Sequence, residues 1–312
     1  MKTAIFGFCM ACLIAAAAMT GRADEPPARK SLTMAEILAA AKPEDWRALD
    51  PENTLYVELA SGRVVVELAP AFAPLHAANV KALARERYYD GLAIMRVQDN
   101  YVAQWGDPNA EDAEKARRIR NARKSLPPEF DRAIDAKAPF TPLPDGDVYA
   151  AEVGYSDGFP AARDRRSGRM WLVHCYGMVG AGRGDTPDSG SGAEIYAVIG
   201  HAPRHLDRNV TLFGRVIQGM ELLSSLPRLS GPMGFYEKPE QLISIRSIRV
   251  AADVHPEERS DLEVMRTDTA AFRELIEARR QRSEEWFLFK PGRVELCNVP
   301  VPVRKKSPPQ AN

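Results

Sequence analysis

The chain has 312 residues, of which 45% are hydrophobic and 27% are charged, and this composition excludes a globally disordered protein. Its formal net charge is zero, so neither a nucleic-acid partner nor a polybasic membrane-binding surface is expected. The length suits one or two domains, and 24 prolines with 21 glycines favour many turns and long ordered loops over a helical bundle.

The N-terminus has the pattern of an export signal. Lys2 is basic, residues 3–20 carry no charge, and small residues around Gly21 and Ala23 suit cleavage after Ala23. A single transmembrane anchor is the alternative, because an uncharged segment of this length is borderline for spanning a bilayer. Cleavage is favoured because the alanine-rich segment is weakly hydrophobic. We therefore expect residues 1–23 to be removed and the mature protein to be periplasmic or secreted, free of the membrane.

Cleavage would leave Cys175 and Cys297 as the cysteines of the mature chain. Two cysteines can pair in an oxidising compartment, but two separate buried thiols fit the sequence equally well. Their wide separation indicates neither a metal site nor a redox pair.

Residues 24–53 form a lead with a short helix over 33–41, where Thr33 and Glu36 have the spacing of a capping box. Two β-rich runs, 54–59 and 63–68, are close enough to form a hairpin. A helix is predicted over 76–87, with His76 in its first turn rather than acting as a ligand.

The stretch 94–107 predicts two strands in which single polar residues interrupt apolar sequence. Arg96 stands between two apolar residues, and Gln104 stands between an alanine and a tryptophan. An arginine buried in such surroundings is costly unless something uses it, which makes Arg96 a candidate functional residue. Exposure on the wet face of an alternating strand is the alternative.

The central region is rich in charge, proline and glycine. Residues 110–124 suggest a solvated surface helix, with a basic binding patch as the less favoured alternative. Residues 127–160 predict a proline-rich loop ordered by aromatic contacts, and residues 171–176 predict a strand. The glycine-rich run 177–192 lacks the spacing of a phosphate-binding loop, so it is interpreted as a loop between strands.

The remaining elements are short. The pattern predicts a turn over 205–209 and a helix over 219–226. It predicts strands over 194–199, 211–217 and 242–251. Beyond residue 254 the chain becomes highly charged, with an amphipathic helix over 269–280 and short apolar runs over 286–288 and 294–303. Residues 255–312 are interpreted as an appendage on the main domain, because they are too few to fold well alone.

Several motifs, in order and spacing, resemble those of the cyclophilin-type peptidyl-prolyl cis–trans isomerases. The resemblance covers about 54–250. It is carried by these segments: Tyr88-Tyr89-Asp90-Gly91, Arg96-Val97, Gln104-Trp105-Gly106-Asp107-Pro108, Gly177 to Arg183, Asp188 to Tyr196, His205-Leu206-Asp207 and Leu212 to Val216.

The resemblance implies a mainly β fold, a closed eight-stranded antiparallel β-barrel capped by two helices. The cyclophilin-like domain would span 54–254. A long insertion at 111–170 and the appendage at 255–312 have no counterpart in a minimal member of the family.

The resemblance also implies a set of site residues. The family's catalytic arginine falls on Arg96, its polar neighbours fall on Gln104 and Glu194, and its rim aromatic falls on His205. The apolar surface for the substrate proline falls on Tyr101, Val102, Tyr196 and Leu206.

The chain departs from the family at several of these positions. Phenylalanine is expected at Tyr101 and Tyr196, methionine at Val102, glutamine at Glu194 and tryptophan at His205. Elsewhere, Asn209-Val210 lies where the family has a histidine, Ala181-Gly182 replaces a larger pair, and Trp105 replaces a glycine. The arginine and the first glutamine are kept, in a pocket that is more polar at two walls.

The activity implied is rotation about X–Pro bonds in unfolded or extended exported polypeptides, which needs no metal or cofactor. A binding module of the same fold, which holds proline-containing segments with little turnover, is the alternative, motivated by the altered pocket. Hydrolysis by Ser189 or Ser191 is weakly supported, since no Gly-x-Ser-x-Gly elbow lies between a strand and a helix. The sequence leaves the clients, the isomerisation rate and the oligomeric state open.

Overall fold

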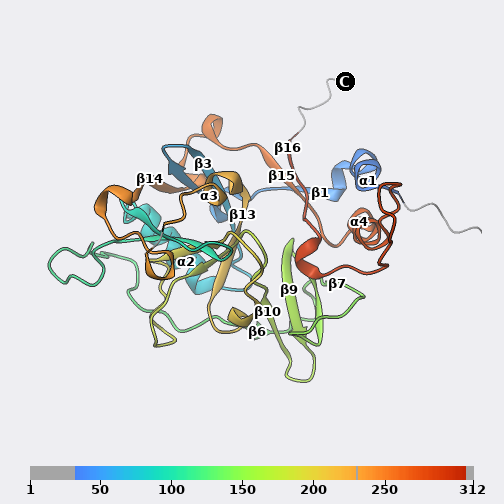
Figure 1. Ribbon diagram of the computed structural model, residues 1–312, viewed down its shortest axis with the longest axis horizontal. Helices are drawn as coiled ribbons and strands as arrows, with labels where there is room; N and C mark the ends of the chain where they lie inside the picture. Colours follow the sequence, from blue (N-terminus) through green and yellow to red (C-terminus); the bar gives the residue numbers. More distant parts are fainter. Residues whose placement is uncertain (1–31, 230, 307–312) are drawn as a thin grey trace, which may run out of the picture. The chain divides into compact units, whose positions relative to one another are not determined.

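The computed structural model describes residues 32–229 and 231–306 (Figure 1). The predicted export signal and cleavage point lie outside these residues. Within the described part of the chain, no helix combines the length and apolar character needed to cross a membrane.

Eight antiparallel strands close into a barrel in the order β11-β12-β5-β4-β14-β2-β3-β13. This confirms the barrel expected from the resemblance. The strands are β2 (Thr54–Leu59), β3 (Gly62–Leu68), β4 (Ala93–Val97), β5 (Val102–Gly106), β11 (Met178–Ala181), β12 (Ile195–Val198), β13 (Leu212–Gln218) and β14 (Ile243–Val250).

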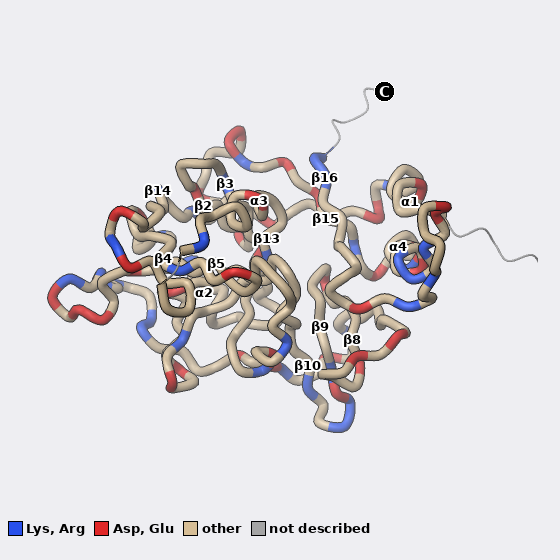
Figure 2. The backbone as a smooth tube through the Cα atoms, in the orientation of Figure 1, with Lys and Arg blue, Asp and Glu red and all other residues tan. Residues whose placement is uncertain are grey.

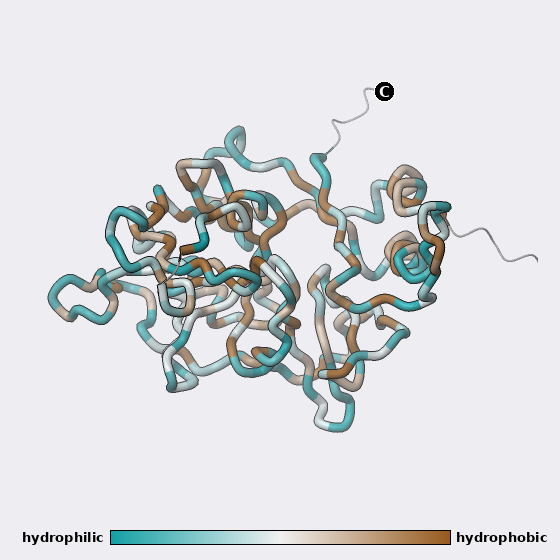
Figure 3. The backbone as a smooth tube through the Cα atoms, in the orientation of Figure 1, coloured by the Kyte–Doolittle hydropathy of each residue, from teal (hydrophilic) through white to brown (hydrophobic). Residues whose placement is uncertain are grey.

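Alternate strand residues point into the barrel because successive side chains of a strand face opposite sides. The inner positions, among them Val66, Trp105 and Phe213, form one hydrophobic core. Two helices, α2 (Pro74–Arg85) and α3 (Met220–Ser224), contribute residues to it. Figure 3 shows hydrophobic residues along the barrel strands, whereas the loop after β5 is hydrophilic.

A second core lies on the outer face of the barrel. Val102, Met178 and Tyr196 project from the barrel strands into it. It also takes residues from a five-stranded sheet and from both ends of the described chain. The sheet is β6 (Arg132–Ala133), β10 (Arg169–Leu172), β9 (Phe159–Asp164), β8 (Glu152–Ser156) and β7 (Thr141–Pro142), in that order.

The two ends of the described chain meet in a small sheet and a helix pair. The elements are α1 (Met34–Ala40), β1 (Trp46–Ala48), β15 (Leu262–Met265), α4 (Ala270–Gln281) and β16 (Val303–Lys305), with β15 at the centre of the sheet. Helix α1 contacts α4. Cys175 and Cys297 form a disulfide with their Cα atoms 5.1 Å apart, which resolves the pairing left open by the sequence.

Local signals predicted several elements correctly. The capping box of Thr33 and Glu36 is formed at the start of α1. The amphipathic helix expected over 269–280 is present as α4, and the side chain of Thr269 caps its first turn. The hairpin of β2 and β3 is also confirmed. These elements depend on contacts close in sequence, which explains why they could be predicted.

The predicted helix over 110–124 is wrong. The segment is a series of turns: amides up to Ala116 donate to nearby carbonyls without forming a helical ladder, and later amides donate to side chains from outside the segment. Glu86 accepts from Asn121, Asp107 accepts from Arg117, and Asn79 accepts from Arg123. Figure 2 shows acidic and basic residues mixed along the first part of this loop.

The central region contains more sheet than predicted. The proline-rich stretch includes the hairpin of β8 and β9, whose pairing covers Tyr155 opposite Pro160. The strand expected at 171–176 is displaced, since β10 ends at Leu172 and 173–176 is not a strand, and the glycine-rich run includes β11. The β8–β9 and β9–β10 pairings join neighbouring segments, so the Asp157-Gly158 turn was a local hairpin signal that the proline-rich composition concealed.

Candidate functional site

Arg96 lies on β4, opposite Gln104 on β5. The next residue, Val97, belongs to the barrel core, so strand alternation directs Arg96 to the outer face. Its guanidinium donates to three oxygens: Nε to the carbonyl of Met233 at 2.8 Å, Nη1 to Oε1 of Gln104 at 3.0 Å, and Nη2 to Oε1 of Gln98. Every one of these acceptors is electrically neutral.

Two aromatic rings orient the same guanidinium. Its central carbon lies 5.7 Å from the ring centre of Tyr101 and 5.2 Å from that of Phe235. Phe235 also forms an isolated β-bridge with Arg96. Burial lowers the pKa of Arg96, opposed by Tyr101 and Glu194, but an arginine remains protonated throughout the physiological range.

Gln104 joins Arg96 to Glu194. Because the arginine needs an acceptor, the amide oxygen of Gln104 faces it and the amide nitrogen is left to donate to Oε2 of Glu194 at 2.7 Å. Burial raises the pKa of Glu194, opposed by the hydrogen bond from Gln104. A Cβ at Gly182 would lie 2.9 Å from Oε2 of Glu194, so the small residue leaves room for this pair.

The other site residues inferred from the resemblance differ in exposure: two are half-buried and two are buried. Tyr101 is half-buried beside Arg96, and its ring stacks on that of His205 with centres 6.3 Å apart. Val102 and Tyr196 are buried, 3% and 6% exposed, and belong to the second core. Leu206 is half-buried in the 3₁₀ turn η3 (Arg204–Leu206).

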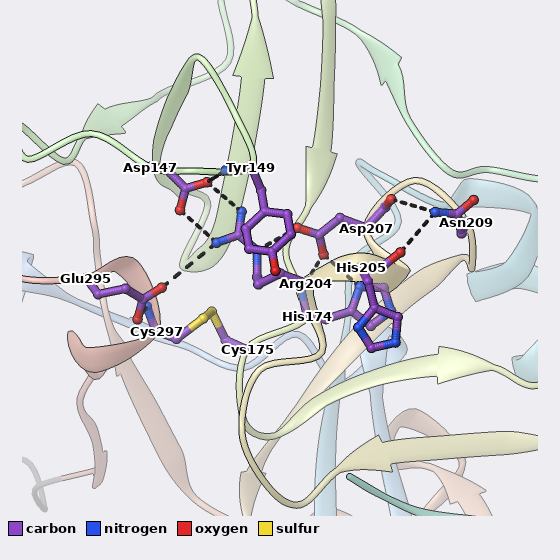
Figure 4. Close-up of polar contacts among 10 residues, drawn as sticks. All are labelled: Asp147, Tyr149, His174, Cys175, Arg204, His205, Asp207, Asn209, Glu295 and Cys297. Carbon is purple, nitrogen blue, oxygen red and sulfur yellow. Dashed lines mark hydrogen bonds and ion pairs between the residues drawn. A yellow bond between two sulfur atoms is a disulfide. The ribbon is translucent and has the colours of Figure 1, made fainter.

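Tyr196 is held by a buried polar network (Figure 4). Asp207 accepts from Nδ1 of His174 at 2.8 Å, so Nε2 of the neutral imidazole accepts from the hydroxyl of Tyr196, also at 2.8 Å. Burial lowers the pKa of His174, which favours this neutral form, and burial raises the pKa of Tyr196 well above its usual value. A Cβ at Gly180 would overlap the Tyr196 hydroxyl, so only glycine fits beneath it.

The network continues to Arg204, which lies between two carboxylates (Figure 4). Its Nε donates to Asp207 at 2.6 Å, and its two terminal nitrogens donate to Asp147 at 2.7 and 2.9 Å. The disulfide lies beside this network in the chain, since Cys175 follows His174. The buried network therefore fixes η3, which carries His205, to the loop between β7 and β8 that carries Asp147.

Sequence reasoning did not identify Gln98, Met233, His174 or Arg204. Gln98 had a usable signal, because it is two residues from Arg96 and so on the same strand face. Met233 acts through its backbone carbonyl, which no side-chain pattern reveals. His174 and Arg204 meet only through tertiary packing.

The arrangement offers hydrogen-bond donors and an apolar wall, not a nucleophile. The hydroxyl of Ser189 donates to the carbonyl of Thr186, and that of Ser191 accepts from the amide of Ala193. Neither hydroxyl is bonded to a histidine in the described residues, so the geometry gives hydrolysis no support. Among the same residues, no cluster of three or more His, Cys, Asp or Glu could hold a metal ion.

Comparison with known proteins agrees with this geometry. A family model described as cyclophilin type peptidyl-prolyl cis-trans isomerase/CLD matches residues 54–250. A probable peptidyl-prolyl cis-trans isomerase of Brucella suis is 28% identical over 203 residues, which is 63% of this chain and 83% of that protein. Human peptidyl-prolyl cis-trans isomerase-like 1 is 37% identical over 71 residues, 23% of this chain and 40% of the relative.

A solved structure extends the likeness beyond the barrel. The crystal structure of cyclophilin AquaCyp293 from Hirschia baltica has a TM-score of 0.68 at 26% identity, and covers 88% of this chain and 99% of its own. That coverage is larger than the family match, so elements outside 54–250 are shared as well. The motifs, the closed barrel and the family match together show that this chain belongs to the cyclophilin-type peptidyl-prolyl cis–trans isomerases, enzymes that act on X–Pro bonds.

Proposed function

We propose that the protein catalyses isomerisation of X–Pro bonds in exported unfolded or extended polypeptides, with Arg96 as the catalytic donor. The observation that carries this proposal is the hydrogen-bonding of Arg96. A guanidinium has five N–H groups, and three of them are used by Met233, Gln104 and Gln98. One N–H on each terminal nitrogen remains for a substrate.

The chemistry needs such a donor. Rotation about a peptide bond has a barrier of about 18–20 kcal/mol because it interrupts amide resonance. In the twisted amide the nitrogen regains its lone pair and becomes an acceptor. A fixed donor that never loses its charge stabilises that state more than the planar amide, and so lowers the barrier.

Gln104 and the apolar wall complete the proposed site. Gln104 accepts from Arg96 and thereby positions it, while Glu194 fixes the orientation of the Gln104 amide. Tyr101 and Leu206, both half-buried, would contact the proline ring, with the buried Val102 and Tyr196 supporting them from beneath, and the exposed His205 would form the rim.

The exported setting rests on two independent observations. The N-terminal sequence has the pattern of a cleaved signal. The Cys175–Cys297 disulfide suits an oxidising compartment. We therefore propose that the substrates are chains in the periplasm or outside the cell.

The test is a proline-peptide isomerisation assay on the purified mature protein. We expect Arg96→Ala to lower kcat/KM roughly a hundredfold, the range for loss of one transition-state donor. Arg96→Lys keeps the charge but loses the planar fork, so it should recover only a fraction of the rate. Arg246→Ala, at an exposed position on β14, is the control. Wild-type protein that fails to accelerate isomerisation, or an unchanged rate in Arg96→Ala, would refute the proposal.

The altered wall motivates one alternative, a scaffold that holds proline-containing segments with little turnover. A hydroxyl at Tyr196 and a carboxyl at Glu194 stand where the family has phenylalanine and glutamine. Suppression of aggregation of an unfolded client separates the two functions. A scaffold would protect the client equally well with and without Arg96, and would show no isomerisation above background.

A further inference from the structure

A groove of about 680 Å³ adjoins the proposed proline site and shares one residue with it. Its walls come from the start of β8, the turn between β9 and β10, and η3. His205 lines the groove, and its ring stacks on Tyr101, which in turn contacts Arg96. The groove therefore begins one side chain away from the catalytic arginine.

The rim of the groove has an excess of positive charge. Glu152 accepts from both Arg163 and Arg165, so one carboxylate balances two guanidiniums. Asp131 is likewise shared by two arginines, of which Arg208 lines the groove. Each of these clusters keeps one net positive charge.

Arg166 adds an arginine that is not neutralised by an ion pair. It is exposed at the turn between β9 and β10, where Figure 2 shows basic residues, and it makes no ion pair with any residue that the structure describes. The neighbouring Asp164 also lines the groove, and the hydrogen bond from the backbone amide of Arg166 lowers the pKa of its carboxyl, so Asp164 keeps its negative charge and the two residues together add no net charge to the rim. Because it forms no ion pair, the guanidinium of Arg166 is still available to an anionic ligand.

The base of the groove is less positive than the rim. Arg204 lies there between Asp147 and Asp207, a cluster that keeps one net negative charge, and the ring of Tyr149 lies over the guanidinium at 4.9 Å (Figure 4). Trp171, only 5% exposed, lies under Arg208. An extended chain could rest on the exposed ring of Tyr149, with acidic side chains directed to the arginine rim.

We propose that this groove binds an acidic segment of the polypeptide substrate that flanks the X–Pro bond. The inference rests on the proposed function, because the bound segment continues from the proline held beside Arg96. An extended chain advances about 3.3–3.6 Å per residue, so residues roughly two to five positions from the proline reach the groove past His205.

The test compares peptides that differ only two to five positions from the proline, where they carry glutamate or glutamine. Glutamates are placed on the N-terminal side in one set and on the C-terminal side in the other. In one of these sets we expect kcat/KM at low salt to be about two- to fivefold higher for the acidic peptide, the range for exposed ion pairs. The ratio should fall towards one in Arg166→Glu and at high salt. Arg246→Glu makes the same charge change on β14 and should keep the ratio.

Fluorescence anisotropy of the same peptides, labelled with a dye, measures binding without turnover and so separates the groove proposal from the proposed isomerase function. Turnover with no charge preference in either set would overturn the proposal that the groove binds acidic segments. A preference that Arg166→Glu and Arg246→Glu reduce equally would overturn it too. Charge-dependent binding that Arg166→Glu abolishes, without turnover of any peptide, would support the groove and overturn the proposed isomerase function.

Discussion

Arg96 is half-buried and Arg204 is buried, and the two arginines differ in the charge of the groups that surround them. Arg96 donates to a backbone carbonyl and two amide oxygens, all neutral. Arg204 donates to the carboxylates of Asp147 and Asp207. Burial lowers the pKa of Arg96, whereas for Arg204 the two carboxylates outweigh burial and raise it.

The positive charge of Arg96 is therefore available to a ligand, whereas that of Arg204 is offset by two carboxylates. Neutral acceptors fix the orientation of Arg96 but leave its positive charge for a ligand. The two carboxylates more than offset the charge of Arg204 and tie η3 to the loop before β8. Substitutions at Arg204 should therefore affect stability first, and those at Arg96 should affect activity first.

The largest expected effect on stability is that of Arg204→Met. It leaves Asp147 and Asp207 buried without a cation, so the free energy of unfolding should fall by about 3–5 kcal/mol. Chemical denaturation measures it. Arg85→Met is the matched control, because Arg85 also pairs with two carboxylates, Glu52 and Asp253, but at an exposed position where about 1 kcal/mol or less is expected. Equal losses in the two variants would contradict the contrast.

Removal of the disulfide should have the next largest effect. Cys175→Ser with Cys297→Ser opens a link between residues 122 positions apart, and a loss of about 2–4 kcal/mol is expected. The barrel that positions Arg96 does not contain this link, so kcat/KM at a temperature where the variant is folded should stay near that of wild type. A large loss of turnover in folded protein would show that the two regions are coupled.

Tyr196→Phe should cost about 1–2 kcal/mol at neutral pH, because Nε2 of His174 loses its donor. A histidine whose folded pKa is lowered contributes stability above its usual pKa of about 6.5 and loses it as the pH falls through the folded pKa. The hydroxyl favours the neutral ring, so the cost should shrink on acidification. Tyr89→Phe, which loses a bond to the carbonyl of Gly192, should show a cost independent of pH.

Glu194→Gln is expected to have the smallest effect, and its sign is fixed by the raised pKa. A carboxyl whose folded pKa is raised favours folding below its usual pKa and loses that contribution as the pH rises through the folded value. The variant should therefore gain stability relative to wild type as the pH rises above about 4.3. Thermal unfolding between about pH 4 and 8 measures this, with Glu221→Gln on α3 as the exposed control. A gain that appears only at low pH would have the wrong sign.

Much of the fold was predictable because its signals are local or ordered along the chain. The hairpin of β2 and β3, the caps at Thr33 and Thr269, and the motif around Arg96 and Gln104 can all be found in sequence. The turns over 110–124 could not, because several of their amides donate to side chains far away in sequence, Glu86 and Asn79.

The sequence by itself indicated the family through the order and spacing of its motifs, and the resemblance in turn implied the barrel and the roles of Arg96 and Gln104. Only the tertiary structure decided the partners that give each arginine its role. It brought the carbonyl of Met233 to Arg96, carboxylates to Arg204 and Cys297 to Cys175. These contacts join segments far apart in sequence, and their energies depend on burial that no local pattern specifies.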